Sequence, residues 1–285
     1  MSHALRLLPL LTSVLLAQEV PTVTARVGLG GYVDTFSDAT GTRNGTFLNA
    51  SWFHDRSGPW SLSLLRSERT EGVGTLVTVG KEQAFGESSW AWLGLSKGSS
   101  ADFLPQYRAD LDTHFVSRSG WGIGAELAWS RYADRSTMLL LQAGPSWEHG
   151  EWSASARIQQ LQYSDGGGSD TGLLLDLRWG AHNLSRWHSL RMAAGSGILD
   201  AWQPGGTHNG TPMDSSMATT GGWASRGGRR GPGSSGLSSP EERLVAVTTH
   251  LPFNTRLALQ GELSWGQRDD QFTTRGVSLQ LLWTW

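Results

Sequence analysis

Four ionisable side chains recur at every second position of one segment. Arg108, Asp110, Asp112 and His114 are each separated by a single uncharged residue. In an extended chain, alternate residues share a face and lie about 7 Å apart. An imidazole beside a carboxylate can activate water or a serine hydroxyl. Histidine and carboxylates are also metal ligands, so this spacing raises two kinds of chemistry, hydrolysis and metal binding.

Neither chemistry has a second supporting feature in the sequence. No serine is identifiably paired with His114, and alternate positions on one strand rarely converge on a single ion. Residues 28–31 (GLGG) lack the third glycine of a dinucleotide-binding loop and open no helix. We therefore predict no enzymatic activity and no catalytic, cofactor-binding or metal-binding residues. A hydrolase of lipid or peptide, using His114 with Asp110 or Asp112, remains the competing class.

The residues on the other face of the same segment indicate which way the four ionisable side chains point. Tyr107, Ala109, Leu111, Thr113 and Phe115 form a largely apolar stripe with the period of a β-strand. Charges are costly at lipid depth, so in a transmembrane strand the charged stripe faces the lumen. The same parity in other segments gives a set of predicted lumen-lining side chains. They are Arg108, Asp110, Asp112, His114, Glu126, Arg157, Asp176, Arg178, Arg191, Arg256 and Glu262.

The last nine residues, 277–285, alternate apolar and polar side chains and finish on Trp285, with Leu282 as the one exception. A bare apolar edge strand invites aggregation, whereas a closed barrel has no such edge. We expect this strand to pair with the first one and to turn its apolar side toward lipid. We also expect the barrel-assembly machinery to recognise it.

The first residues indicate export. Arg6 precedes an apolar run, and Gln18-Glu19 follows it, which is typical of a secretory signal peptide over residues 1–17 cleaved near Ala17. The run is too short to span a bilayer as a helix. A frayed or core-packed N-terminal helix is the alternative interpretation. The chain has no cysteine, which excludes disulfides, thiolate metal sites, cysteine nucleophiles and a lipoprotein anchor.

Composition favours a membrane barrel over a soluble enzyme. Only 17% of residues are charged, and the chain contains 37 Gly and 15 Trp. Soluble domains have about 25% charged residues, and tryptophan is enriched at the two faces of a bilayer. The net charge of -2 argues against a nucleic-acid partner. A secreted soluble β-sandwich is the alternative fold, and the need for detergent during extraction separates the two.

About fourteen segments have strand character, each near the 9 to 11 residues that a tilted transmembrane strand needs. The fold class is therefore all-β: one antiparallel transmembrane β-barrel over residues 18–285, with twelve strands as the alternative count. The expected strands are 23–36, 46–54, 60–69, 75–84, 89–97, 104–116, 121–132, 137–147, 152–163, 172–179, 189–199, 242–251, 256–266 and 272–285.

Loop lengths agree with this count, because outer-membrane barrels have short periplasmic turns and longer extracellular loops. Counted from the first strand, the longest connection, 200–241, falls on the extracellular side. It is rich in glycine and serine, so we predict a flexible solvated loop. Its basic cluster at residues 226–230 leaves open a contact with lipopolysaccharide phosphates or, less favoured, with nucleic acid.

Several aromatic stretches resemble one family. Residues 30–38, 90–100, 103–108, 120–127 and 131–134 look like the YaiO-type family of bacterial outer-membrane β-barrels. The resemblance covers roughly residues 28–200 and departs in the glycine-rich loop and the late strands. It implies location in the outer membrane of a Gram-negative bacterium and no established enzymatic activity.

These observations predict a porin-like barrel without cofactors. Around eight strands leave an interior filled by side chains, and 16 to 18 leave an open channel, so fourteen lies between these limits. We expect a pore or an export-associated channel for a small solute or glycan, with the mixed-charge lumen setting selectivity. The alternatives are the outer-membrane hydrolase and a surface adhesion or structural barrel. The expected partners are outer-membrane lipid, lipopolysaccharide and the assembly machinery, with no nucleic acid.

Overall fold

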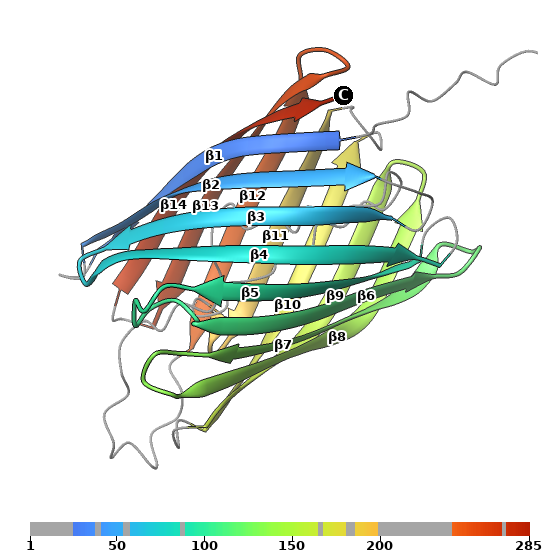
Figure 1. Cartoon of the computed structure of the whole chain (residues 1–285). Helices are drawn as coiled ribbons and strands as arrows, with labels where there is room; N and C mark the ends of the chain where they lie inside the picture. The colour runs from blue at the N-terminus through green and yellow to red at the C-terminus, as the bar shows by residue number, and fades with distance from the viewer. Residues whose placement is uncertain are drawn as a thin grey trace, which may run out of the picture.

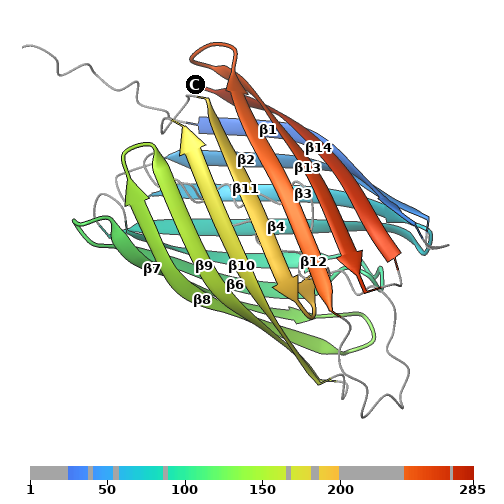
Figure 2. The same ribbon diagram turned by 180° about the vertical axis from the view of Figure 1, so that it is seen from behind.

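The computed structural model describes residues 25–37, 41–53, 58–85, 89–164, 168–180, 186–198, 241–269 and 272–285. Their fourteen strands form one closed antiparallel barrel, in which each strand pairs with the next and β14 pairs with β1 (Figures 1 and 2). The predicted fold class and strand number are confirmed. Within the described residues, no helix is long and apolar enough to cross a bilayer. The signal peptide over residues 1–17 and loop residues 200–240, including the basic cluster, lie outside the described residues.

The strand bounds lie close to those expected from the alternation of side chains. The strands are β1 (Ala25–Phe36), β2 (Thr42–Phe53), β3 (Pro59–Arg69), β4 (Gly72–Ala84), β5 (Trp90–Gly98), β6 (Tyr107–Val116), β7 (Trp121–Arg131), β8 (Thr137–His149), β9 (Trp152–Tyr163), β10 (Ser169–Gly180), β11 (Trp187–Gly195), β12 (Glu242–Pro252), β13 (Leu257–Arg268) and β14 (Phe272–Thr284).

Several strand starts differ from the prediction by two to four residues, and the structure gives a physical reason for two of them. β2 begins at Thr42 rather than residue 46, and Arg43 in this extension lies opposite Asp34 and donates a hydrogen bond to it. β6 begins at Tyr107 rather than residue 104. Leu104 instead turns inward and packs in the barrel interior.

The closing pair shows how the alternation works. β1 and β14 are in register from Arg26 opposite Thr284 to Phe36 opposite Thr274. Leu282 faces inward opposite Gly28 and is 7% exposed, which explains why it interrupts the alternation. Both termini of the barrel therefore lie at one end, which we call the periplasmic end, and the opposite end is called the outer end.

The outward face is apolar, as a lipid contact requires. Leu29, Ile158 and Leu263 are each more than 60% exposed, which water would disfavour and hydrocarbon favours. Tryptophan side chains form an outward-facing belt next to the short turns of the periplasmic end, as expected at a membrane interface. The exposed members of this belt are Trp52, Trp60, Trp121, Trp152, Trp283 and Trp285.

The inward face holds three apolar clusters toward the outer end. The first lies on β7–β9, the second on β1–β4 with the β5–β6 connection, and the third on β11 and β12. Their members are Ala128, Tyr132, Met138, Leu140 and Leu161; Tyr32, Phe47, Leu65, Leu76, Phe103 and Leu104; and Ala193, Ile198, Leu244 and Ala246. These clusters cover part of the inward face in the outer half of the barrel.

Glycines in the wall let large side chains cross a neighbouring strand. The indole of Trp92 on β5 lies across Gly80 on β4 and donates a hydrogen bond to the Ser61 hydroxyl on β3, at 3.3 Å. A side chain at Gly80 would collide with this indole. Tyr32 crosses Gly45 in the same way. Such contacts fill the interior beside the strand ladder and fix the curvature of the wall.

Candidate functional site: the barrel interior

Most of the predicted lumen-lining side chains face inward in the structure. Seven are buried, with exposed fractions between 0% and 7%, and three more, Asp176, Arg178 and Arg191, are half-buried on β10 and β11. The buried set consists of Arg108, Asp110, Asp112, His114, Glu126, Arg157 and Glu262.

Arg256 is the exception, because it lies in the β12–β13 turn and is exposed. The Asn254 carboxamide oxygen accepts hydrogen bonds from the backbone N–H groups of Arg256 and Leu257, at 2.8 and 2.9 Å. This Asx-type turn closes the connection before β13 begins at Leu257. The sequence pattern had placed Arg256 one step inside the strand.

The interior charges pair along the wall. Arg108 Nε donates to Asp110 Oδ1 at 2.7 Å, and both side chains are at most 2% exposed. Arg191 Nε donates to Asp176 Oδ1 at 2.6 Å from the adjacent strand. Two further pairs of this kind are Arg43 with Asp34 and Arg268 with Glu242. Each of these pairs stays within one strand or joins neighbouring strands.

His114 has a different carboxylate neighbour from the one expected. Its Nε2 atom lies 3.1 Å from Glu148 Oε1 on β8, and its ring lies 5.9 Å from that of Trp90. Asp110 and Asp112 occupy successive inward positions of the same strand as His114, and Asp110 accepts a hydrogen bond from Arg108. Sequence reasoning assigned Glu148 to a turn, whereas β8 continues to His149. Gln142 and Ser146 face inward, and Glu148 continues this alternation, so the sequence pattern of β8 could have placed Glu148 in the lumen.

Arg157 crosses the wall toward the acidic side chains of β6 and β7. Its guanidinium lies against Gly124 on β7, which stands opposite Gly144 on β8. The side chain is 2% exposed, and among the described residues none of its three guanidinium nitrogens has a hydrogen-bond partner. Both carboxylate oxygens of the buried Glu82 are in the same situation. Buried polar groups of this kind need water or a polar solute to complete their hydrogen bonds.

Sequence reasoning missed a second surface in which uncharged polar side chains predominate, beside the buried Glu82 of β4. Hydroxyl and amide side chains line the inward face of β14 and β2–β5, where Ser63 donates to Asn49 at 2.7 Å and Thr78 bonds to Ser96 at 2.9 Å. We call this surface the hydroxyl arc; its members are Asn49, Ser51, Ser61, Ser63, Thr78, Ser96, Ser278 and Gln280. A charged arc follows on β6–β11; its members are Arg108, Asp110, Asp112, Glu126, Arg157, Asp176 and Arg191.

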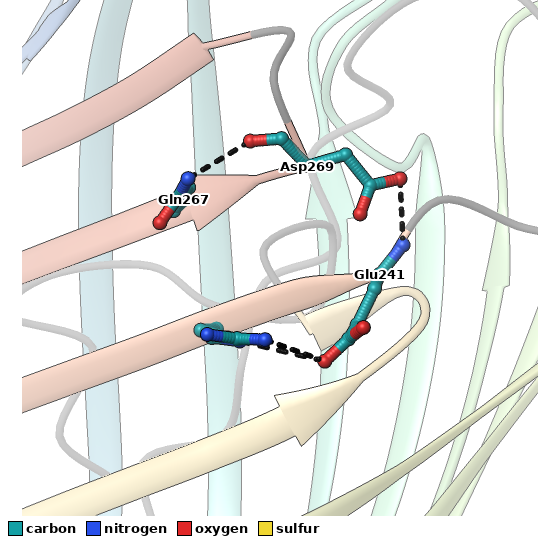
Figure 3. Close-up of a pocket in the computed structure, with 4 residues that line it drawn as sticks. Glu241, Gln267 and Asp269 are labelled. Atoms are coloured by element: carbon teal, nitrogen blue, oxygen red, sulfur yellow. Dashed lines mark hydrogen bonds and ion pairs between the residues drawn. The ribbon is translucent and has the colours of Figure 1, made fainter.

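A polar pocket lies at the outer end of β12 and β13, and its lining residues hydrogen-bond to one another (Figure 3). Asp269 Oδ2 accepts from the Glu241 backbone N–H at 3.0 Å, and Arg243 Nη2 lies 3.1 Å from Glu241 Oε1. Gln267 Nε2 donates to the Asp269 carbonyl at 3.0 Å. In the described part of the chain, no group of three His, Asp or Glu side chains could hold a metal ion.

Solved structures share the barrel architecture at low sequence identity. A bacterial polysaccharide outer membrane secretin is 9% identical with a TM-score of 0.52, over 92% of this chain and 99% of that one. The anion-selective porin from Comamonas acidovorans is 9% identical with a TM-score of 0.46, over 93% and 99%. The Acinetobacter baumannii outer membrane protein Omp33 is 7% identical with a TM-score of 0.46, over 92% and 99%. No curated protein matches the sequence.

The family assignment comes from the sequence itself. The model of the YaiO membrane beta barrel domain matches residues 24–197, which is more than half of the chain. The match ends after β11 and leaves β12–β14 to complete the closed sheet. Together with the closed fourteen-stranded barrel, it places the protein in the bacterial outer membrane. The chain belongs to the YaiO family of membrane β-barrels.

Proposed function

We propose that this barrel is a non-enzymatic channel through which a small polar solute of low charge, such as a sugar or a short glycan, crosses the outer membrane. The hydroxyl arc carries the proposal. Its serine, threonine and amide groups both donate and accept hydrogen bonds, as the hydroxyl groups of a sugar do. A lining of this kind can exchange bonds with a passing solute without holding it by charge.

The charged arc supports a solute of low charge. Two of its three arginines are ion-paired with carboxylates of the same wall, Arg108 with Asp110 and Arg191 with Asp176. Opposite charges at such short distance largely cancel at the centre of the lumen. A channel with this lining should discriminate weakly between small cations and anions.

The names of the similar solved structures suggest which solutes to test. One is named as a polysaccharide secretin and another as an anion-selective porin. At 9% identity their likeness to this chain concerns the fold. A glycan is therefore one class to test, and an anion is the contrasting class.

Solute uptake by proteoliposomes tests the proposal. We expect the folded barrel to admit neutral sugars and to show similar permeability to potassium and chloride in a planar bilayer. Replacing the inward Ser63 by Leu should slow sugar uptake, because the new side chain removes a hydroxyl and narrows the passage. Leu62→Ala on the outward face of the same strand is the matched control and should leave uptake unchanged. A folded wild-type barrel that passes neither sugar nor ions would overturn the proposal.

The hydrolase alternative is favoured by one observation, the contact between the buried His114 imidazole and Glu148. It predicts cleavage of lipid or peptide substrates that is lost in His114→Ala. A barrel that conducts nothing and shows this His114-dependent cleavage would replace the channel proposal.

The adhesive alternative depends on loop residues 200–240, which lie outside the described residues. It predicts that deleting residues 205–236 abolishes binding to cells or glycans. The channel proposal predicts that this deletion leaves solute uptake roughly unchanged.

A further inference from the structure

Three outward-facing side chains meet at the outer end of the barrel. Tyr107 at the start of β6 is the direct cross-strand partner of Lys97 on β5 and of Arg131 on β7. Strands in a sheet are about 4.8 Å apart, so the backbones of Lys97 and Arg131 are separated by about 10 Å with the tyrosine between them. All three side chains are exposed on the lipid side of the wall. We call them the cationic triad.

The triad lies at the level where lipid headgroups are expected. The next outward residues toward the middle of the membrane are Leu95, exposed by 61%, and Trp129, exposed by 40%. At the periplasmic end, the same strands present Phe115 and Trp121 outward instead. The outward face of these strands therefore carries cations together with aromatic side chains at the outer interface and aromatic side chains without cations at the periplasmic one. This difference matches a membrane whose two leaflets have different headgroups.

Two other outward cations at the outer end, Arg66 and Arg243, have protein partners, whereas Arg275 on β14 stands without an aromatic hydroxyl or a second cation among its cross-strand neighbours Thr35 and Trp265. Arg66 lies 3.6 Å from Glu68, and Arg243 lies 3.1 Å from Glu241 in the pocket of Figure 3. Among the described residues, neither Lys97 nor Arg131 has a carboxylate in ion-pairing distance. The two positive charges of the triad are therefore available to an anion outside the protein.

We propose that the cationic triad binds a phosphate group of the phosphorylated glycolipid in the outer leaflet. An arginine supplies a planar fork of N–H donors, a lysine supplies a compact ammonium, and the tyrosine adds an O–H donor between them. Together these groups suit one phosphate above an apolar wall that contacts the acyl chains. This inference is independent of whether the lumen conducts, because it concerns only the outer surface.

Lipid titration of the purified full-length barrel, followed by native mass spectrometry, tests the proposal. The probes are diphosphoryl lipid A, its phosphate-free form and phosphatidylglycerol. For the Lys97→Gln/Arg131→Gln variant we expect about tenfold weaker binding of diphosphoryl lipid A, because charge-assisted hydrogen bonds are lost. Tyr107→Phe should weaken binding less. Arg118→Gln, which removes an exposed charge at the periplasmic end, is the matched control and should bind like wild type.

Three results would overturn the proposal. The double variant could bind diphosphoryl lipid A as tightly as wild type, or the phosphate-free form could bind wild type equally well, which would indicate acyl-chain contacts alone. Equal binding of phosphatidylglycerol would exclude a site for the glycolipid. Because all three side chains are exposed on the lipid face, the variants should fold, and the shift in gel mobility of unheated samples checks this.

Discussion

At the scale of single residues, the interior is organised by what each charge touches. Arg108 is 3% exposed and contacts Asp110, with Glu126 at 4.0 Å. The lumen charges therefore stabilise the wall as well as line it. If this arginine is removed, its buried carboxylate partners lose the cation that they pair with.

Removing this arginine should destabilise the barrel far more than removing an exposed one. We expect Arg108→Met to lower the free energy of unfolding by about 3 kcal/mol, because it leaves buried carboxylates without their cation. Arg66→Met, whose pair with Glu68 is about half exposed, should lower it by at most about 0.5 kcal/mol. Urea-induced unfolding in lipid vesicles measures both values. Equal losses in the two variants would show that the interior pair is as hydrated as the surface pair.

At the scale of elements, the β5–β6 connection shapes the outer end of the lumen. Phe103 and Leu104 leave the strand path and pack against Leu76 and other side chains of β1–β4. The Arg69 guanidinium lies 4.6 Å from the centroid of the Phe103 ring, which is a cation–π contact. The connection thus fills part of the barrel interior near the outer end with apolar contacts.

Loosening this connection should widen the outer mouth. Leu104→Ala removes a side chain that is 1% exposed, and comparable truncations cost about 2–5 kcal/mol of packing free energy. We expect the variant to keep its strand content and to show a higher single-channel conductance than wild type. Leu95→Ala, an outward truncation on β5, is the control. Unchanged conductance in a folded Leu104→Ala barrel would show that this cluster does not limit the passage.

The strands could be predicted from the sequence because lipid and lumen impose opposite demands on alternate residues. The parity of β6, with Arg108 inward and Leu111 outward, is an example. The inward turn of Phe103 and Leu104 could not be predicted, because apolar residues at the end of a strand also suit its lipid face. The partnership of His114 with Glu148 depends on two strands that are not adjacent. Their relative position follows from the register of two successive strand pairs rather than from a local sequence pattern.

Serine and threonine positions of the hydroxyl arc were also missed, because uncharged polar residues occur in turns as often as in a lumen. Arg256 shows the reverse error, since its charge and parity indicated the lumen while Asn254 held it in a turn. Charged lumen-facing side chains could therefore be predicted from the sequence better than neutral polar ones. The neutral polar side chains are the ones that the proposed function needs.

At the scale of the whole molecule, closure of the sheet determines the two surfaces. Pairing of β1 with β14 leaves the described sheet without an edge, so apolar side chains face outward and polar ones face inward around the full circumference. The aromatic belt at the periplasmic end and the cationic triad at the outer end then give the barrel an orientation in the membrane. Both proposals, for the lumen and for the outer surface, depend on this separation of faces.

Cysteine accessibility tests that separation most directly, because the chain contains no cysteine of its own. Leu62 and Ser63 are consecutive residues of β3, the first exposed on the outward face and the second in the hydroxyl arc. In proteoliposomes, a small water-soluble thiol reagent should modify Ser63→Cys rapidly and leave Leu62→Cys protected by lipid. Rapid modification of Leu62→Cys together with an inert Ser63→Cys would contradict the account.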